Sequence, residues 1–131
     1  MKSTKHLGIW MDHSIAYLNE LTNGTIIATN TIESQPKLQV KEEDLYFKDE
    51  SHMLNKEQKQ RAAFYKRISD VITGYEEVIL FGPTEAKNEL LNLLRANHLF
   101  DKIKIEIKTT DKMTENQQHD FVKGYFHLQY P

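Results

Sequence analysis

Residues 77–94 read EVILFGPTEAKNELLNLL, and this stretch decides the fold class. It begins with a short apolar run bounded by turn residues, which is typical of a strand buried on both faces of a sheet. The tripeptide Gly82-Pro83-Thr84 then opens a helix, since proline at an early helical position costs no hydrogen bond. The predicted buried face of that helix comprises Ala86, Leu90, Leu93 and Leu94. A central strand that leads directly into a helix predicts an α/β domain.

The stretch nearer the amino terminus predicts an antiparallel meander. Residues 7–11 are apolar at almost every position, so we expect a second central strand, parallel to the strand at residues 77–81. Residues 15–21 and 25–32 read as two further strands. They are joined by Asn23-Gly24, the strongest short hairpin signal, because a type I′ turn needs positive φ at both central positions.

The rest of the chain predicts two more helices and an edge strand. A stripe at helical spacing predicts a helix that begins near residue 56 and ends at Gly74. Residues 102–108, KIKIEIK, alternate strictly and read as an edge strand protected by charge. Thr114-Glu115-Asn116-Gln117 fits a capping box at the start of a last helix. The apolar faces of the two helices are Phe64, Ile68, Val71 and Ile72, and Phe121, Val122, Tyr125 and Phe126.

Together these elements predict one domain over residues 1–131, in the order β-β-β, long loop, α-β-α-β-α. Strand order 3-2-1-4-5 keeps the two strands that are apolar on both faces in the centre and the charged strand at an edge. The predicted fold is therefore a three-layer α/β domain with a five-stranded mixed sheet and about three helices, the layout of the ribonuclease-H-like group. Residues 33–55 show no convincing period and are expected to form a long loop or insertion.

The amino-acid composition excludes several kinds of functional site and of protein. The chain has 131 residues, a formal net charge of −2 and no cysteine, which excludes disulfides, thiolate metal sites and a cysteine nucleophile. The near-neutral balance argues against a protein that coats nucleic acid along its whole surface. No stretch is apolar and long enough for a membrane span or a signal peptide, so we expect a cytoplasmic protein without a membrane partner.

The candidate catalytic residues do not form a complete set. Asp12, at the end of the first strand, and Glu57 could supply two carboxylates to a pair of metal ions, but two-metal hydrolysis needs several. Residues 78–82 bring no further acid to the carboxyl end of the neighbouring strand. We therefore interpret Asp12 as a turn-forming residue. His13 remains a candidate for acid–base chemistry or metal binding, although we expect neither a cofactor nor a metal.

Two features favour the binding of anions. Gly82, Thr84 and Lys87 lie where a parallel strand ends and a helix begins, and unpaired N–H groups there suit a phosphate; a purely structural turn and cap is the alternative. Residues 56–67 carry five basic residues against Glu57, a local charge of +4 (5 − 1). The predicted RNA-binding residues on this helix are Lys59, Arg61, Lys66 and Arg67, although a solvated helix face explains the charge equally well.

Three stretches taken together resemble a known family: residues 8–18 (GIWMDHSIAYL), residues 77–94, and residues 109–126 (TTDKMTENQQHDFVKGYF). They are similar to the middle domain of the archaeal and eukaryotic class 1 peptide-chain release factors and of Pelota. They are more similar still to small stand-alone bacterial relatives described as translational machinery proteins. The resemblance covers most of the chain except residues 33–55, and it implies the same ribonuclease-H-like sheet.

The resemblance also implies a role in translation. In the release factors this domain carries Gly-Gly-Gln between the third strand and the first helix, and that tripeptide promotes peptidyl-tRNA hydrolysis. Here no glycine lies between Gly24 and Gly74, so the motif is absent and neither Gln35 nor Gln39 is expected to act in catalysis. The stand-alone relatives tend to carry several adjacent histidines in this region, where this chain has only His52. We therefore expect a non-catalytic protein that binds the ribosome or tRNA, in ribosome rescue, hibernation or stress.

Two alternatives of other classes stay open. One is a metal-dependent nuclease or phosphodiesterase that uses Asp12, Glu57 and His13. The other is a protein-interaction module or homodimer built on the fifth strand or on Tyr46 and Phe47. The sequence does not determine the oligomeric state.

Overall fold

The computed structural model describes residues 5–34 and 50–129, which form one mixed sheet with helices on both faces. In chain order the elements are β1 (Lys5–Met11), β2 (Ile15–Thr22), β3 (Thr25–Glu33), α2 (Glu50–Ile72), β4 (Glu77–Gly82), α3 (Ala86–Arg95), the 3₁₀ turn η1 (His98–Phe100), β5 (Lys104–Thr109) and α4 (Glu115–Gln129). The strand order is β3-β2-β1-β4-β5. The predicted α/β fold and sheet order are confirmed.

The sheet combines both kinds of strand pairing. β1 pairs with β2 and β2 with β3 in antiparallel fashion, whereas β4 lies parallel to both β1 and β5. The turn between β2 and β3 has φ of 52° at Asn23 and 79° at Gly24, which confirms that both central residues of this turn adopt positive φ. None of the described helices combines the length and the apolar character needed to cross a bilayer.

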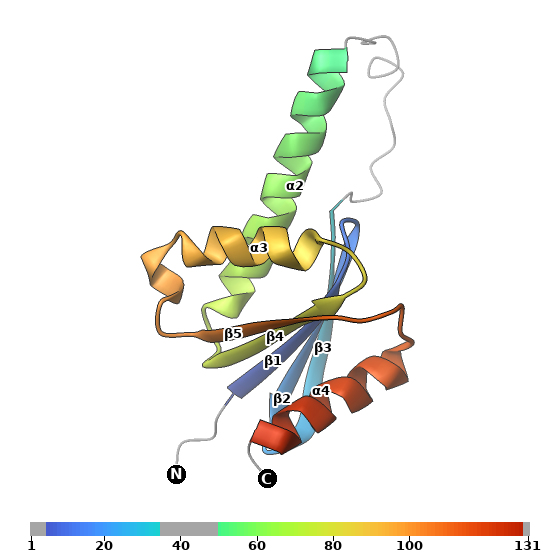
Figure 1. Ribbon diagram of the computed structural model, residues 1–131, viewed down its shortest axis with the longest axis vertical. Helices are drawn as coiled ribbons and strands as arrows, with labels where there is room; N and C mark the ends of the chain where they lie inside the picture. Colours follow the sequence, from blue (N-terminus) through green and yellow to red (C-terminus); the bar gives the residue numbers. More distant parts are fainter. Residues whose placement is uncertain (1–4, 35–49, 130–131) are drawn as a thin grey trace.

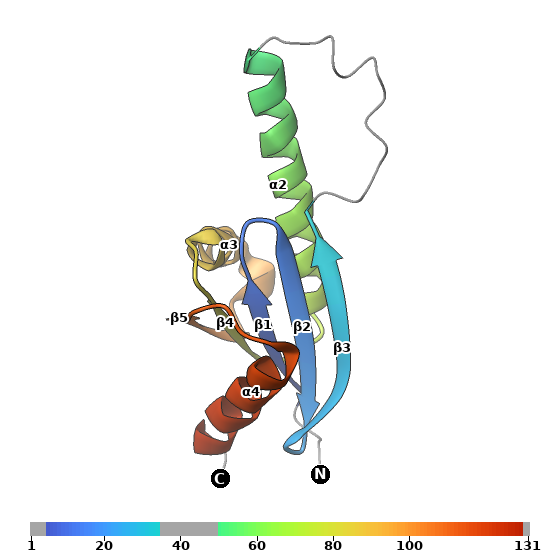
Figure 2. The ribbon, with the colours of Figure 1, turned by 90° about the vertical axis from the view of Figure 1, so that its right-hand side faces the viewer.

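α2 and α3 cover one face of the sheet and α4 covers the other (Figures 1 and 2). β1 supplies both cores: Leu7, Ile9 and Met11 pack on the α2 and α3 side, and Trp10 packs on the α4 side. Because both faces of the central strands are covered, their sequences show no alternation. At the β5 edge, Ile105 packs against the core while Lys104 stays exposed, as the alternating pattern predicts.

The capping box at the start of α4 is confirmed. The Gln117 N–H donates to the Thr114 side-chain oxygen at 3.2 Å, and the Thr114 N–H donates to Oε1 of Gln117 at 2.9 Å. The two bonds satisfy backbone donors that a helix start leaves unpaired. They fix the beginning of the helix that forms the third layer of the domain.

Two details of the helices differ from the prediction. α2 begins at Glu50 rather than near residue 56. The sequence pattern does not reveal these first turns, because positions 57, 60 and 61 are polar and the apolar stripe does not extend before Phe64. On α3, Leu93 is 53% exposed and Leu91 is buried in its place. Lys87, a charged residue expected outside, is buried on the same side of the helix, one turn before Leu91.

Candidate functional site

The carboxyl ends of β1 and β4 lie next to each other because the two strands are parallel partners in the middle of the sheet. Residues 12–14 follow β1 here, and residues 83–89 lead from β4 into α3. Figure 2 shows the β1–β2 turn beside α3, at the end of the sheet from which α2 projects. We call this end of the sheet the carboxyl edge. In open α/β sheets, ligands commonly bind at such an edge.

Asp12 shapes the turn after β1. Its Oδ1 accepts hydrogen bonds from the backbone N–H groups of Ser14, at 2.7 Å, and of Ile15, at 2.9 Å. This is an Asx turn, in which the short carboxylate replaces a backbone acceptor. The geometry supports the interpretation of Asp12 as a turn-forming residue, and the turn sets the position of His13.

Four side chains meet beside this turn: His13, Arg61, Tyr65 and Glu89, which we call the edge cluster. Nε2 of His13 lies 2.9 Å from Oε2 of Glu89, and the Tyr65 hydroxyl donates to Oε1 of Glu89 at 3.0 Å. An Nη atom of Arg61 lies 3.7 Å from the same Oε1. The side chains of His13 and Glu89 are 36% and 38% exposed, so the cluster lies at the surface.

The electrostatics of the cluster follow from these contacts. The hydrogen bond from His13 lowers the pKa of the Glu89 carboxyl below its ordinary value; Tyr65 and Arg61 act in the same direction, against partial burial. Burial, together with the bond to Glu89, raises the pKa of the Tyr65 hydroxyl. At neutral pH Glu89 is therefore an ionised acceptor and Tyr65 a neutral donor. Both oxygens of Glu89 are engaged, so the cluster is better suited to holding His13 and Arg61 in place than to base catalysis.

Sequence reasoning found His13 and Arg61 but missed Tyr65 and Glu89. Tyr65 follows Phe64 in the apolar stripe of α2 and reads as a core residue, and its ring is indeed buried. A signal was present, because Arg61 and Tyr65 are four residues apart and therefore share a helix face. Glu89 lies in the first turn of α3, where an acidic residue is common for electrostatic reasons alone.

The residues suggested for a metal site are not assembled into one. Within residues 5–34 and 50–129, no group of three or more histidine, aspartate or glutamate side chains could hold a metal ion. Glu57 is exposed on α2, one turn before Arg61. Asp12 uses one carboxylate oxygen in its turn, and His13 is bonded to Glu89.

The turn after β4 holds its polar groups internally. The Lys87 ammonium donates to the Thr84 carbonyl at 2.6 Å, and Lys87 is only 1% exposed. The Thr84 hydroxyl accepts from the Ala86 N–H at 3.2 Å. Gly82 has φ of 147°, and a Cβ there would lie 2.1 Å from the Met11 carbonyl oxygen. These three residues, predicted as an anion-binding turn, form a closely packed junction between β1, β4 and α3.

The four basic residues predicted on α2 point in different directions. At 100° per residue, Lys59 and Lys66 share a face, whereas Arg61 lies nearly opposite, toward Glu89. Lys66 pairs with Asp70 at 2.6 Å. Arg67 donates to the Glu33 carbonyl at 2.5 Å, next to the end of β3. Lys59 is exposed and makes no ion pair with any residue that the structure describes.

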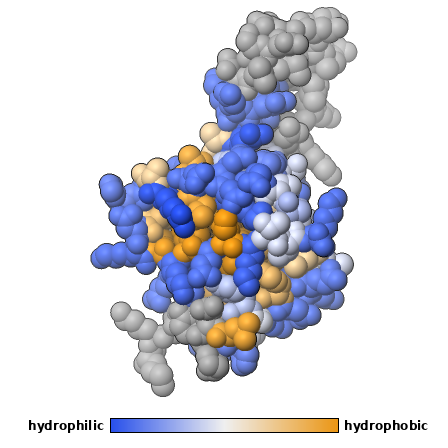
Figure 3. Space-filling view, viewed as in Figure 1, coloured by the Kyte–Doolittle hydropathy of each residue, from blue (hydrophilic) through white to orange (hydrophobic). Residues whose placement is uncertain are grey.

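The amino-terminal part of α2 extends beyond the sheet in both ribbon views (Figures 1 and 2). Residues 56–63 are exposed, apart from the half-buried Gln60, whereas Phe64 and the residues after it begin to pack on the sheet. The surface of the projecting part is hydrophilic in Figure 3. Among the described residues, positions 56–63 therefore form no buried face, and their side chains lie mostly in solvent.

No protein-family model matches the chain, and no curated protein matches it. Among solved structures, Pelota of Archaeoglobus fulgidus has 11% sequence identity and a TM-score of 0.56, over 98% of this chain and 36% of that chain. Pelota of Thermoplasma acidophilum has 13% identity and a TM-score of 0.58, over 92% of this chain and 32% of that chain. The archaeal translation termination factor aRF1 aligns at a TM-score of 0.45 and 13% identity, over 95% of this chain and 40% of that chain.

The chain thus spans about a third of the length of each Pelota protein. At these identities the likeness concerns the fold, and at the level of the fold it confirms the resemblance to Pelota noted in the sequence. The chain has the fold of a domain-sized part of Pelota.

Proposed function

We propose that this protein acts in translation and binds the ribosome or tRNA through the projecting part of α2. The observation that carries the proposal is the exposure of residues 56–63 around almost the whole circumference of a helix that extends past its own domain. The fold shared with Pelota and the sequence resemblance to release-factor middle domains support a role in translation. Ribosome rescue, hibernation and stress are the settings in which such a role would act.

The existing partners of the basic residues on α2 indicate which of these residues we expect to contact RNA. Lys59 projects from the exposed segment and is available to a phosphate without breaking an ion pair within the described residues. Lys66, on the same face, would exchange an exposed partner, Asp70, for a phosphate at little cost, because exposed ion pairs contribute at most about 1 kcal/mol. Arg61 lies on the other side of the helix, toward Glu89, and Arg67 donates to the Glu33 carbonyl. We therefore expect Lys59 and Lys66 to dominate RNA binding.

The proposed interface also includes the long loop and the Gly82 turn. Most of the long loop that joins β3 to α2, residues 35–49, lies outside the described residues. The Gly82 turn lies at the same carboxyl edge, but its Lys87 ammonium is turned inward. Its contribution would therefore come from backbone groups and from Thr84 rather than from Lys87.

Co-sedimentation with ribosomes over a series of KCl concentrations tests the proposal. The test variant is Lys59→Glu/Lys66→Glu. The control, Lys5→Glu/Lys102→Glu, changes the net charge equally at exposed positions near the amino ends of β1 and β5, at the other end of the sheet. Each phosphate that the protein no longer neutralises reduces the slope of log K against log salt by roughly 0.7–0.9. We expect the slope of the test variant to fall by about 1.5 and that of the control to stay unchanged.

Three outcomes would contradict the proposal. They are an absence of co-sedimentation at the lowest salt, equal reductions of binding in the test and control variants, and unchanged binding in the test variant. Far-ultraviolet circular dichroism of each variant separates a loss of binding from a loss of helix.

One observation favours a second candidate, a protein-interaction module. Apolar side chains gather in the middle of the face shown in Figure 3. A groove of about 260 Å³ lies between α3 and β5. Leu93 on α3 and Leu99 in η1 are 53% and 74% exposed. Tyr46 and Phe47, also named for this role, lie outside the described residues. Light scattering over a range of protein concentrations would reveal self-association, which Leu99→Asp is expected to weaken; a monomer at every concentration would contradict a homodimer.

A further inference from the structure

The two edge strands of the sheet, β3 and β5, differ in how they are protected. β5 carries Lys104, Glu106 and Lys108, and such charges discourage pairing with the edge of another chain. β3 has no charged residue and no proline from Thr25 to Ile32. It is the outermost strand in Figure 2, and no other strand of the described residues 5–34 and 50–129 pairs with its outer side. We call this outer side of β3 the open edge.

The register of β3 identifies the backbone groups on the open edge. The Ser34 N–H donates to the Ser14 carbonyl at 2.9 Å, so the backbone groups of Ser34 point toward β2. Backbone groups alternate in direction along a strand, and the pairing with β2 shows no shift in this part of β3. The N–H and C=O groups of Thr29, Thr31 and Glu33 therefore point outward.

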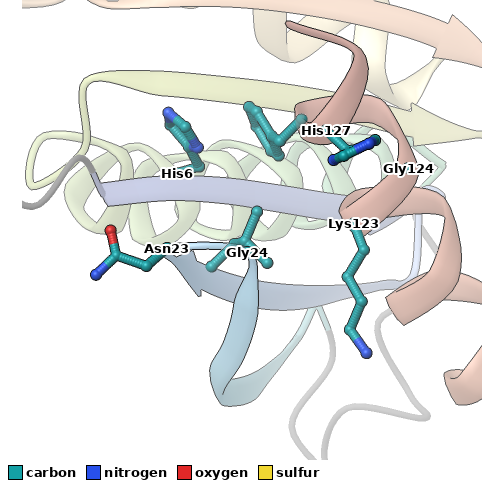
Figure 4. Close-up of a pocket in the computed structure, with 8 residues that line it drawn as sticks. His6, Asn23, Gly24, Lys123, Gly124 and His127 are labelled. Carbon is teal, nitrogen blue, oxygen red and sulfur yellow. The ribbon is translucent and has the colours of Figure 1, made fainter. Parts of the chain in front are cut away.

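Both ends of the open edge are bounded. At one end, the Glu33 carbonyl already accepts a hydrogen bond from Arg67. At the other end, a shift in register marks a β-bulge close to the hairpin, where the strand twists away from regular pairing. The hairpin turn itself lies beside α4, where Asn23 and Gly24 line a cavity together with Lys123 (Figure 4). The regular stretch between these ends leaves the backbone groups of two threonines for a further strand.

This stretch is complementary to itself. Asn30 lies at its centre, between Thr29 and Thr31, and is flanked further out by Ala28 and Ile32. When two copies pair antiparallel about Asn30, Thr29 lies opposite Thr31 of the second copy. Each of the two threonine pairs exchanges two backbone hydrogen bonds, so about four form in all. Ala28 lies opposite Ile32 of the second copy, so apolar side chains also meet. An interface between identical copies requires such a match.

We propose that two copies of the chain dimerise by antiparallel pairing of their β3 strands, on a two-fold axis that passes through Asn30. The two sheets join into one. Both edges of the joined sheet are then β5, whose charges oppose further pairing, so association stops at the dimer. One strand pair is smaller than a standard interface of about 1,600 Å², so we expect a Kd of about 10–100 µM. The pairing uses neither the projecting part of α2 nor the α3–β5 groove, so its test does not depend on ribosome binding.

Sedimentation velocity of the full-length protein, at concentrations from about 1 µM to 1 mM, tests the proposal. Asn30→Lys places two like charges opposite each other on the axis, and Asn30→Glu does the same with the other sign. Each variant is expected to raise the Kd at least about fivefold. An equimolar mixture of the two is expected to restore dimers, because lysine then lies opposite glutamate. Asn30 is exposed, so neither change disturbs the core of the monomer.

The matched control is Thr109→Lys, which adds the same charge at an exposed position on β5 and is expected to dimerise like the wild type. Hydrogen exchange followed by NMR gives a second measurement. The amides of Thr29 and Thr31 are expected to exchange more slowly as the protein concentration rises, because they donate to the second copy only in the dimer.

Four outcomes would overturn the proposal. A monomer up to about 1 mM would leave the open edge to another occupant, such as an extended segment of a different protein. A dimer that Thr109→Lys or Leu99→Asp weakens and Asn30→Lys does not would lie on the β5 side of the domain. Failure of the mixture to restore dimers would exclude an axis at Asn30, and species larger than a dimer would exclude a closed two-fold assembly.

Discussion

Nε2 of His13 lies 2.9 Å from Oε2 of Glu89, although 76 residues separate the two in the sequence. This bond joins the turn after β1 to the first turn of α3. Tyr65 on α2 donates to the other oxygen of the same carboxylate. A single ionised side chain thus connects three segments at the carboxyl edge, and it holds α2 at the point where its projecting part begins.

Replacing His13 by alanine is expected to raise the pKa of the Glu89 carboxyl toward its ordinary value of 4.5, because the hydrogen bond from His13 is the main cause of the lowering. A carboxyl with a depressed folded-state pKa contributes stability that is present above pH 4.5 and is lost as pH falls through the lower value. His13→Ala should therefore also reduce the loss of stability in acid. Carbon-detected NMR titration of Glu89 measures the pKa, with the neighbouring exposed Ser14→Ala as the control. An unchanged pKa would show that the His13 bond does not form in solution.

Gly82→Ala is expected to destabilise the domain by at least about 2 kcal/mol. Its φ of 147° disfavours any residue with a Cβ, and that atom would lie 2.1 Å from the Met11 carbonyl oxygen, part of a central strand that cannot move aside. In the control Gly74→Ala, the nearest atom would be the Val71 oxygen at 3.7 Å, so a change within about 0.5 kcal/mol is expected. Urea unfolding of both variants provides the measurement. If Gly82→Ala and Gly74→Ala had equal free energies of unfolding, β1 and β4 could not approach each other as closely at Met11 and Gly82 as the structure shows.

The sheet was predictable from sequence because its signals are local. Apolar residues on both faces place β1 and β4 in the centre, and the alternating charges of β5 place that strand at an edge. The edge cluster was only half predictable. Whether Glu89 meets His13 and Tyr65 depends on where α2 and α3 lie over the sheet, and helical periodicity fixes the face of a helix but not its position along the sheet.

Lys87 shows a second limit of sequence reasoning. A lysine in the first turn of a helix is expected at the surface, ready for an anion, because lysine is almost never fully buried without a partner. Here the partner is the Thr84 carbonyl, three residues back in the same turn. The sequence does not show that this carbonyl is within reach of the ammonium, nor that Leu91 rather than Leu93 shares the buried face with Lys87.

Thr114→Ala is expected to lower the free energy of unfolding by about 1 kcal/mol, the usual cost of losing a helix cap. The Thr114 side chain accepts from the Gln117 N–H, which has no other partner within the helix. Asn116→Ala, an exposed change between the two capping residues, should alter stability by less than about 0.5 kcal/mol. Thermal unfolding followed by circular dichroism compares the variants, and equal melting temperatures for both would contradict the contribution of the capping box.

The stability of the domain is expected to fall as the pH drops below 6.5, through His6. Burial lowers the pKa of this imidazole below 6.5, and the nearby Glu77 and Glu76 only partly oppose the shift. The unfolded chain therefore takes up a proton at a pH where the folded chain does not. By linkage, stability is lost as pH falls from 6.5 toward the lower folded-state pKa, and it levels off below that value.

His6→Phe should abolish this part of the pH dependence while keeping a ring against Phe126. His6→Gln should abolish it as well but lose the ring, so its stability is expected to be lower at every pH. Chemical denaturation at pH values between about 5 and 8 gives the free energy of unfolding for the three proteins. The two variants together separate titration from packing, because only the loss of titration changes the slope against pH. If the free energy of unfolding of His6→Phe kept the wild-type dependence on pH, the acid sensitivity would come from groups other than His6.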